Sequence, residues 1–320
     1  MNEFGGTRFV LEGRSSLHAP AWAFGAFPAD PALLMPALVS LVADELARQR
    51  GSAVPRAEWI GWSAASSLER QIGADSLARL GLVEHVKRFF GLDRLALEDY
   101  LMVSERLGEW CDLACLAMED IGQEAPKITF RTSGSSGTPT WHGHRCRDLG
   151  REVSLHARCF ADVRRIAALV PPHHIYGFLF GVLLPRALGV DVVHLRGLSP
   201  SRALRALGRG DLLVGTPFLL GHLVDHAKRL PHEVSVVTSG SAAQQQLWDA
   251  LRERGAERIV EVYGSTETGG IGVRESADAP FRLLGHRVEA GMLSRDAGPE
   301  EPVATSADAV LTELEATLPD

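Results

Sequence analysis

Hydrophobic positions in the first third of the chain repeat at helical spacing. Between residues 31 and 120, apolar side chains recur every three or four residues, as in Leu34, Leu38, Leu41, Val42 and Leu46, and again in Leu77, Leu80, Val83, Val86 and Phe90. This spacing places the apolar side chains on one face of a helix. The pattern therefore predicts amphipathic helices over this region.

The pattern changes near residue 122. From there on, short apolar or β-branched runs lie at 127–131, 166–170, 190–195, 212–214, 234–238 and 259–263, separated by helical or glycine-rich connections. Strands that alternate with helices predict βαβ units and a largely parallel sheet. Gly122 is suited to end the last helix just before the first strand. Near the carboxyl end, a helix is predicted over 307–317.

Length and charge narrow the class of protein. The chain has 320 residues, 33 Lys plus Arg and 40 Asp plus Glu, and a net charge of −7. At roughly 150 residues per domain, this length predicts two domains. The hydrophobic share of 45% excludes a disordered tail. A mildly acidic chain without a basic block also argues against nucleic acid as a partner.

Cysteine usage and apolar stretches indicate the compartment. The four cysteines, Cys111, Cys115, Cys146 and Cys159, match no paired zinc pattern, and we expect reduced thiols. Residues 1–30 are interpreted as an N-terminal leader without an export signal. The most apolar stretch, 175–188, is shorter than the ~20 residues of a membrane span and contains Pro185. We expect a cytoplasmic protein with no membrane partner.

A loop of glycines and hydroxyls directly follows the run at 127–131. It reads Thr132, Ser133, Gly134, Ser135, Ser136, Gly137 and Thr138, and Pro139 follows. Backbone N–H groups and hydroxyls gathered in such a loop form a concave site for an anionic phosphate group. A plain surface turn is the alternative, because serine and glycine are common in turns.

Further segments extend this pattern, and together they resemble the acyl-adenylate-forming superfamily. That superfamily includes acyl-CoA synthetases, firefly luciferase and the adenylation domains of peptide synthetases. The resemblance lies in the phosphate loop at 130–140, the Pro-His-His-Ile-Tyr-Gly segment at 172–177, the strand and glycine turn at 237–242, and the Tyr-Gly-Ser-Thr-Glu segment within 261–270. It implies an α/β adenylate-forming core with a mostly parallel sheet.

The resemblance also implies a role for each matching residue. The phosphate loop would bind ATP, Gly240 and Tyr263 would flank the adenine, and Gly264 would lie beside them. Thr266 would contact phosphate and Glu267 would bind Mg²⁺, a cation that prefers oxygen ligands. His174 would face the substrate, a small carboxylic acid. The implied reaction converts the acid and ATP into an acyl-adenylate, with transfer to the thiol of coenzyme A or of a phosphopantetheine arm.

Two departures from the superfamily pattern bear on activity. Thr140 stands where the phosphate loop ordinarily ends in lysine. The small C-terminal lid domain and its catalytic lysine are not found after residue 288, so we expect a truncated core and a separate lid-domain protein as a partner. His142, His144 and Cys146 could bind a metal, but no fourth ligand is evident. We favour a role for this segment in partly replacing the loop lysine.

The helical region carries a second resemblance. The segment Ile72-Gly73-Ala74-Asp75-Ser76-Leu77 resembles the attachment motif of acyl carrier proteins, whose serine carries phosphopantetheine. This implies a carrier-like four-helix bundle over 31–120, with Ser76 as the candidate attachment residue. Asp75 is suited to cap the following helix, and a plain helix cap is the alternative. Basic residues along that helix reverse the usual acidic docking surface of a carrier.

These observations predict two domains, a carrier-like helical domain at 31–120 and a truncated AMP-binding core at 121–320. The predicted function is ATP-dependent activation of a carboxylic acid, with a carrier protein as a further partner. The alternative is a non-catalytic carrier or scaffold protein with a degenerate adenylation fold.

Overall fold

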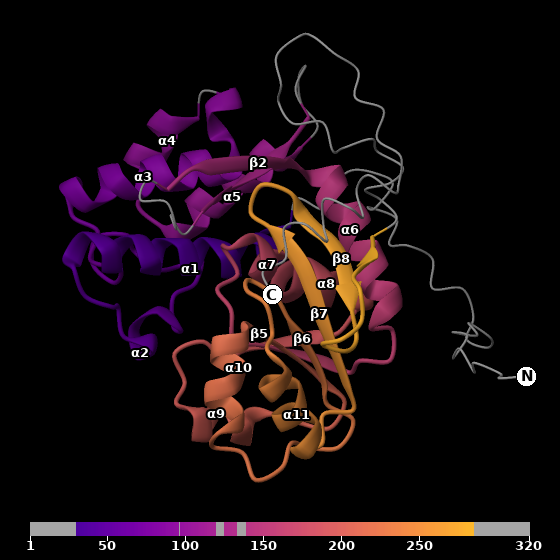
Figure 1. Cartoon of the computed structure of the whole chain (residues 1–320). Coiled ribbons are helices and arrows are strands. Elements are labelled where there is room, and N and C mark those ends of the chain that lie inside the picture. Colours follow the sequence, from indigo (N-terminus) through magenta and orange to yellow (C-terminus); the bar gives the residue numbers. More distant parts are fainter. Residues whose placement is uncertain (1–29, 96, 120–124, 133–138, 285–320) are drawn as a thin grey trace, which may run out of the picture.

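The computed structural model describes residues 30–95, 97–119, 125–132 and 139–284 (Figure 1). The predicted leader at 1–29, the boundary at Gly122, the loop residues 133–138 and the predicted helix at 307–317 lie outside the described residues. The last two residues of the predicted phosphate loop, Pro139 and Thr140, lie within them.

The predicted helices of the first third are confirmed. They are α1 (Pro31–Arg50), α2 (Arg56–Trp59), α3 (Ser76–Phe90), α4 (Glu98–Val103) and α5 (Leu107–Met118), with a 3-10 turn, η2, at Leu92–Leu95. Asp75 caps α3 as expected, because its carboxylate accepts a hydrogen bond from the backbone N–H of Ala78 at 2.8 Å. Gly91 ends the same helix in the left-handed conformation.

A seven-stranded sheet forms the second part, in the order β4-β3-β5-β6-β7-β8-β9. The first five strands in that order run parallel, as predicted, and β8 and β9 are antiparallel additions. Their bounds are β3 (Arg165–Ala168), β4 (Asp191–His194), β5 (Asp211–Gly215), β6 (Ser235–Thr238), β7 (Arg258–Ser265), β8 (Gly269–Arg274) and β9 (Arg282–Leu283).

The first predicted strand does not belong to the large parallel sheet. The run at 127–131 is a strand, β1 (Lys127–Arg131), but it pairs antiparallel with β2 (Trp141–Arg145) in a separate two-stranded sheet. A βαβ crossover needs a dozen or more residues, whereas β1 and β2 are joined by a short loop. The phosphate loop predicted after β1 is thus the connection of a hairpin.

Helices cover both faces of the large sheet (Figure 1). They are α6 (Cys146–Cys159), α7 (Ile175–Phe178), the π-helical turn η3 (Leu179–Leu183), α8 (Leu184–Leu188), α9 (Pro200–Ala206), α10 (Pro217–Val224) and α11 (Gln245–Glu253). Successive residues of β3 belong to different cores: Ile166 and Ala168 pack in one apolar cluster and Ala167 in the other. This alternation is expected of a strand buried on both faces.

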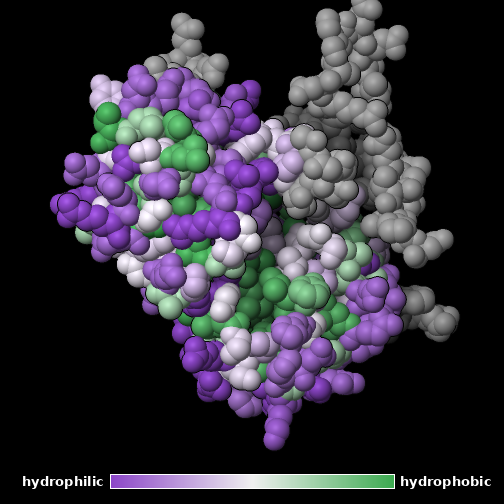
Figure 2. Space-filling model, turned by 90° about the vertical axis from the view of Figure 1, so that its left-hand side faces the viewer, coloured by the Kyte–Doolittle hydropathy of each residue, from purple (hydrophilic) through white to green (hydrophobic). Residues whose placement is uncertain are grey.

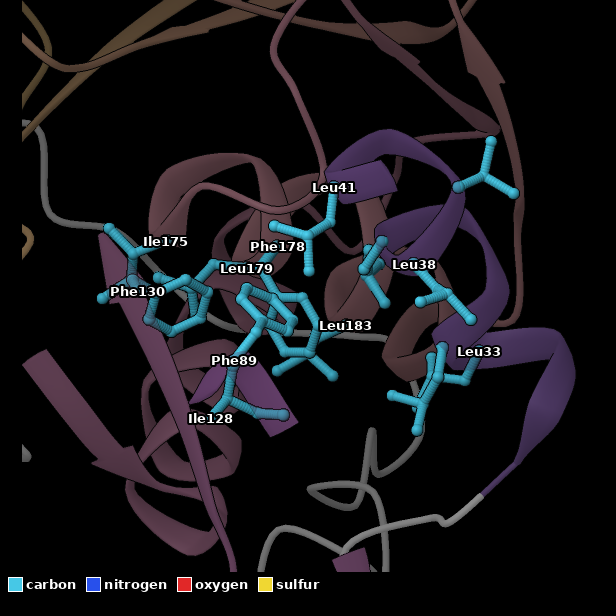
Figure 3. Packing of buried hydrophobic residues seen from close by; sticks show 14 of the residues in the cluster. Leu33, Leu38, Leu41, Phe89, Ile128, Phe130, Ile175, Phe178, Leu179 and Leu183 are labelled. Atoms are coloured by element: carbon cyan, nitrogen blue, oxygen red, sulfur yellow. The ribbon is translucent and has the colours of Figure 1, made fainter. Parts of the chain in front are cut away.

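The helical region and one face of the sheet share a single apolar cluster (Figure 3). Leu38 from α1 and Phe89 from α3 belong to it together with Phe130 and Phe178. The Phe130 ring meets the rings of Phe89 and Phe178 edge-on, both at centroid distances of 5.5 Å. The core therefore continues across the predicted domain boundary, and the carrier-like four-helix bundle is not confirmed.

Two further expectations concern the cysteines and the apolar stretch at 175–188. All four cysteines are free thiols, as expected. The stretch at 175–188 forms α7, η3 and α8. Among the described residues, no helix has both the length and the apolar content needed to cross a bilayer.

Figure 2 shows hydrophilic residues over much of one face, with hydrophobic residues gathered where the surface is hollowed at mid-height.

Candidate active site

A cavity of about 480 Å³ opens where the parallel strands end. Val170 and Pro171 follow β3, Thr216 follows β5, and Gly240 follows β6 by two residues. The last residues of β7 and the turn after it complete this side of the cavity. Ligands of open parallel sheets bind at the carboxyl ends of the strands, so the fold alone makes this cavity the candidate site.

The apolar wall of the cavity comes from α7 and η3. Ile175, Tyr176, Leu179 and Phe180 line it. The Tyr176 hydroxyl donates a hydrogen bond to the carbonyl of Val237 at 2.8 Å, and burial raises the pKa of Tyr176 well above its usual value. Tyr176 is therefore a fixed, protonated donor whose ring lies on the cavity wall.

The β1–β2 hairpin brings the two ends of the predicted phosphate loop together. The backbone N–H of Thr132 donates to the Thr140 carbonyl at 2.8 Å, and the N–H of Thr140 donates to the Thr132 hydroxyl at 2.9 Å. Both threonines line the cavity. Of the predicted loop, Thr132 is thus placed at the site, while Ser133, Gly134, Ser135, Ser136, Gly137 and Thr138 lie outside the described residues.

The turn between β7 and β8 carries the predicted catalytic residues Thr266 and Glu267 to the same cavity. Gly264 is required there, because a Cβ atom at this position would lie 2.3 Å from the carbonyl oxygen of Gly269. The Glu267 side chain is 49% exposed. The hydroxyl of Ser265 lowers the pKa of Glu267 against a smaller opposing effect of burial, and a backbone hydrogen bond and the charges of His142 and His144 lower the pKa further, so the carboxylate is ionised at neutral pH.

Two histidines of β2 contact this turn. His144 donates from Nε2 to the backbone carbonyl of Thr266 at 2.7 Å. His142 Nε2 lies 3.6 Å from Oε1 of Glu267 and 2.8 Å from the Thr140 hydroxyl. Cys146 instead lies in the core, with Sγ 3.6 Å from Sδ of Met118. The three residues that could have formed a metal cluster therefore serve separate contacts, and the histidines link the two predicted phosphate-binding segments.

His174 lies on the wall between this cavity and a second one of about 250 Å³. His174 is exposed to solvent at the surface of the cavity wall, although many protein atoms surround its ring. Desolvation by the surrounding walls, and then the neighbouring His173, lower the pKa of His174 to about 3. A neutral imidazole thus faces both cavities, and Arg131 and Thr132 line both as well.

Gly240 lines the cavity in a backbone conformation with φ of 95°, which favours glycine. Tyr263, predicted beside the adenine, lies outside the described lining of the cavity, and its ring packs against Phe281 at 5.4 Å. Ser76 is exposed at the start of α3, also outside that lining.

Glu152 is a charged cavity residue that the motifs missed. Glu152 of α6 is 2% exposed, lines the cavity, and accepts the backbone N–H of Gly270 at 2.8 Å. A Cβ atom at Gly270 would lie 2.5 Å from this carboxylate. An acid next to Val153, in the apolar stripe of an amphipathic helix, is the signal that could have revealed it.

Residues 13–292 match the AMP-binding enzyme family. The chain belongs to the AMP-binding enzyme family. The matched range includes the whole helical region at 31–120 as well as the strands and the cavity. The helices that resemble a carrier protein thus lie within the range assigned to the family.

Curated relatives of this AMP-binding chain include ligases of aromatic acids. A 4-coumarate–CoA ligase of Cereibacter sphaeroides is 43% identical over 220 residues, which are 68% of this chain and 53% of the relative. One of Rhodobacter capsulatus is 38% identical over 253 residues, 77% of this chain and 65% of the relative. The chain thus spans between about half and two thirds of the length of these relatives.

Among solved structures, an O-succinylbenzoate coenzyme A synthetase from Bacillus subtilis, in complex with ATP and magnesium ion, aligns with 21% sequence identity and a TM-score of 0.42. The alignment covers 56% of this chain and 37% of that one.

Proposed function

We propose that this chain activates a carboxylic acid with ATP and supports its transfer to a thiol. In the first step the acid's carboxylate attacks the α-phosphorus of ATP, the bond to the β-phosphate oxygen breaks, and acyl-adenylate and pyrophosphate result. In the second step a thiolate attacks the acyl carbon and AMP leaves. The observation that carries the proposal is that Thr132, Thr266 and Glu267 meet at one cavity beside His174.

The donor set fits a magnesium nucleotide. Mg²⁺ is ordinarily bound by one or two carboxylates together with substrate phosphates. Glu267 supplies an ionised and accessible carboxylate, and the hydroxyls of Thr132 and Thr140 lie on the same wall. When bound, the cation would neutralise charge on the phosphates, while Thr266 and the β1–β2 hairpin would orient them.

The acid would lie against the aromatic wall. Tyr176 and Phe180 pack edge to face at 5.2 Å and form the aromatic part of the cavity wall. The neutral His174 imidazole would meet the carboxylate end, where it offers a hydrogen bond without an added charge. Because curated relatives are named as ligases of 4-coumarate and of 4-chlorobenzoate, we propose a planar aromatic acid as the substrate and coenzyme A as the acceptor.

The non-catalytic carrier or scaffold alternative receives no support from these relatives. A separate lid-domain protein and a carrier protein remain proposals as partners. The lid-domain protein would supply the catalytic lysine to the first step, and the carrier protein would supply the thiol of the second.

ATP–pyrophosphate exchange tests the first step directly. Exchange should be stimulated by 4-coumarate and 4-chlorobenzoate and only weakly by an aliphatic acid of similar length. The substitution Glu267→Gln should reduce exchange by about a hundredfold, because it removes a cation ligand worth several kcal/mol in the transition state. Glu253→Gln, on the exposed surface of α11, is the matched control. Absence of both exchange and ATP binding in the unmodified chain would contradict the proposal.

A second proposal concerns Ser76, because Leu77 and Leu80 beside it are 79% and 56% exposed. Exposed apolar side chains around an exposed serine suit docking by a modifying enzyme. Coexpression with a phosphopantetheinyl transferase should then add the mass of one phosphopantetheine arm, and Ser76→Ala should abolish the addition. An unchanged intact mass would dismiss this role and leave the adenylation proposal untouched.

A further inference from the structure

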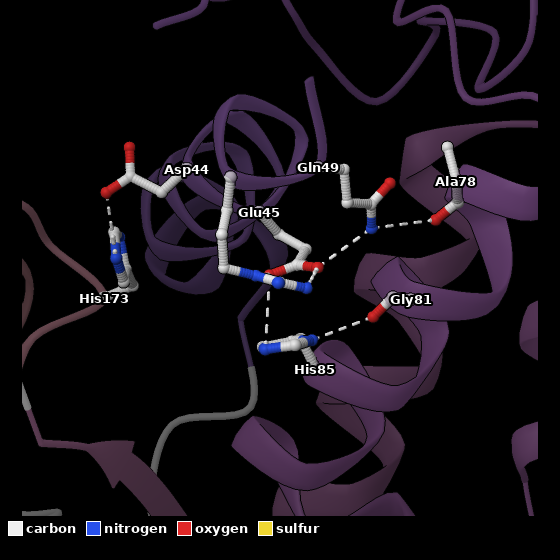
Figure 4. Close-up of polar contacts among 8 residues, drawn as sticks. Asp44, Glu45, Gln49, Ala78, Gly81, His85 and His173 are labelled. Atoms are coloured by element: carbon white, nitrogen blue, oxygen red, sulfur yellow. Dashed lines mark hydrogen bonds and ion pairs between the residues drawn. The ribbon is translucent and has the colours of Figure 1, made fainter. Parts of the chain in front are cut away.

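Four polar side chains close a hydrogen-bonded cycle behind His174. Ser40 and Asp44 come from α1, His173 precedes His174, and Arg196 follows β4. His173 Nδ1 lies 2.9 Å from the Ser40 hydroxyl. Its Nε2 lies 3.3 Å from Asp44 Oδ2 (Figure 4). Arg196 donates to the Ser40 hydroxyl at 2.9 Å and to Asp44 Oδ1. We refer to these residues as the Ser40–Arg196 cycle.

The protons of the cycle can be assigned from its donors and acceptors. A guanidinium only donates, so Ser40 Oγ accepts from Arg196 and keeps its own proton to donate to His173 Nδ1. His173 then carries its proton on Nε2 and donates it to the Asp44 carboxylate. The opposite tautomer would turn a nitrogen lone pair toward a carboxylate oxygen. Every donor in the cycle thus has an acceptor only when His173 is the neutral Nε2–H tautomer.

The charges agree with this assignment. Burial raises the pKa of Asp44, but the hydrogen bond from His173, the charge that His173 carries when protonated, and then the charge of Arg196 outweigh that effect and bring the pKa to about 2. Burial lowers the pKa of His173, and the positive charge of Arg196 lowers it further against the attraction of Asp44. One partly exposed cation, one partly exposed anion and a buried neutral imidazole therefore form a group with no net charge.

The segment that carries Arg196 is itself held in place. Arg56 of α2 donates to the backbone carbonyls of Arg196 and His194, the latter at 2.6 Å. The Trp59 ring lies under both guanidinium groups, 5.2 Å from that of Arg56 and 5.8 Å from that of Arg196. Arg196 is thus held by two side-chain acceptors and by an aromatic ring, which fixes its position more firmly than an isolated surface ion pair would.

The cycle acts on the site through stacked imidazoles. The rings of His173 and His174 have centroids 4.5 Å apart and an interplanar angle of 35°. Neighbouring Glu45 points away from the cycle, toward Arg48 and His85 (Figure 4). Fixing the His173 ring therefore limits the positions open to the His174 ring on the cavity wall.

We propose that Ser40, Asp44 and Arg196 are positioning residues that lock His173 as one tautomer and thereby set the orientation of the His174 imidazole toward the acid. The part that concerns the acid rests on the proposed function. The part that concerns the tautomer does not, because it is a property of the protein without substrate.

A metal ion is the competing use of the same residues. Donor atoms of Asp44, His173 and His174 all lie within 4.8 Å of one another. Metal binding would, however, displace the Nε2 proton of His173 and place a cation beside the Arg196 guanidinium. The hydrogen-bond donors of the cycle all have acceptors without such an ion. The test below therefore includes zinc binding as a result that would contradict the proposal.

Nuclear magnetic resonance of the chain labelled with ¹⁵N-histidine tests the tautomer. At pH 7, His173 should be neutral with its proton on Nε2. In Asp44→Asn, the amide oxygen must face Arg196, which only donates, so the amide NH₂ faces Nε2. His173 should then change to the Nδ1–H tautomer. The control is Asp211→Asn, which alters a buried carboxylate paired with Arg165 away from the cavity and should leave the His173 tautomer unchanged.

Kinetics test the positioning role. Asp44→Asn should raise the KM for the acid by about tenfold and leave the KM for ATP within twofold, whereas Asp211→Asn should change neither.

A doubly protonated or Nδ1–H His173 in the unmodified chain overturns the cycle, whether or not the chain is active. A changed tautomer with an unchanged KM for the acid overturns the positioning role. Binding of one Zn²⁺ per chain that is lost in Asp44→Asn overturns the proposal in favour of a metal site, and absence of exchange with every acid is the separate failure of the proposed function.

Discussion

At the scale of single residues, the site combines an ionised acid with a neutral histidine. Glu267 is accessible and its pKa is lowered by the Ser265 hydroxyl, whereas the pKa of His174 is lowered to about 3 by desolvation. An acid and a base shifted in this way give a cavity with negative charge at the cation side and no added charge at the aromatic side. This separation suits a reaction in which two anions must approach each other.

The lowered pKa of His174 predicts a pH dependence of stability. The unfolded chain takes up a proton at a pKa near 6.5, while folded His174 stays neutral to about 3. The free energy of unfolding should therefore fall as pH decreases from 6.5 toward 3. His174→Gln should flatten this part of the curve, as measured by urea unfolding at a series of pH values. The control His226→Gln replaces an exposed histidine, and a His174→Gln curve parallel to that of the unmodified chain would contradict the prediction.

At the scale of elements, two hairpins line one side of the cavity. The β1–β2 hairpin carries the ends of the phosphate loop, and the β7–β8 hairpin carries Thr266 and Glu267. His144 joins the two through the Thr266 carbonyl. The geometry of this side thus depends on how closely β7 and β8 approach at Gly264.

Gly264→Ala tests that dependence. The added Cβ would meet the Gly269 carbonyl at 2.3 Å, which forces the backbones apart and should cost about 1–3 kcal/mol of stability. The displaced turn should raise the KM for ATP at least tenfold. Gly221→Ala is the control, because no atom lies within 4 Å of its Cβ position. An unchanged KM for ATP in a folded Gly264→Ala chain would show that the turn does not contact the nucleotide.

Sequence patterns predicted the helices and strands that bury a regular series of apolar side chains, and they missed the strands that lack such a series. The parallel strands were found because they are continuous apolar runs. β2 and β8 were missed because Gly143, Gly269, Gly270 and Gly272 interrupt any alternation. The motifs located Thr132, His174, Gly240, Thr266 and Glu267 at the cavity. The acid within the apolar stripe of α6 marks Glu152 in the sequence, but the contacts of Glu152 and of the Ser40–Arg196 cycle were not predictable, because the partners lie more than 100 residues apart.

At the scale of the whole molecule, a single apolar cluster joins the helical region to the sheet. Helix α1 packs on α3, α5 and η3, and α3 packs on β1. The cavity wall formed by His174 therefore has its support in residues from the first part of the chain. Loss of packing between these parts should affect stability and the site together.

Phe89→Ala tests this shared core. Phe89 is 1% exposed and packs against Phe130 and Phe178. Its truncation should cost about 3–5 kcal/mol, and unfolding followed by far-UV circular dichroism and by tryptophan fluorescence should shift together. Leu80→Ala, on the exposed face of the same helix, should change stability by less than about 0.5 kcal/mol. Two separated transitions in Phe89→Ala would mean that the helical region unfolds as an independent unit.

The long separation between α1 and its partners has a consequence for synthesis of the chain. Ser40 and His173 are 133 residues apart, so α1 leaves the ribosome on the order of ten seconds before the segment it packs against. During that interval the leucine stripe of α1 has no partner from η3 to cover it. The nascent chain thus exposes the apolar face of α1 early. We expect the yield of folded protein in cells to depend on chaperones that bind exposed apolar segments.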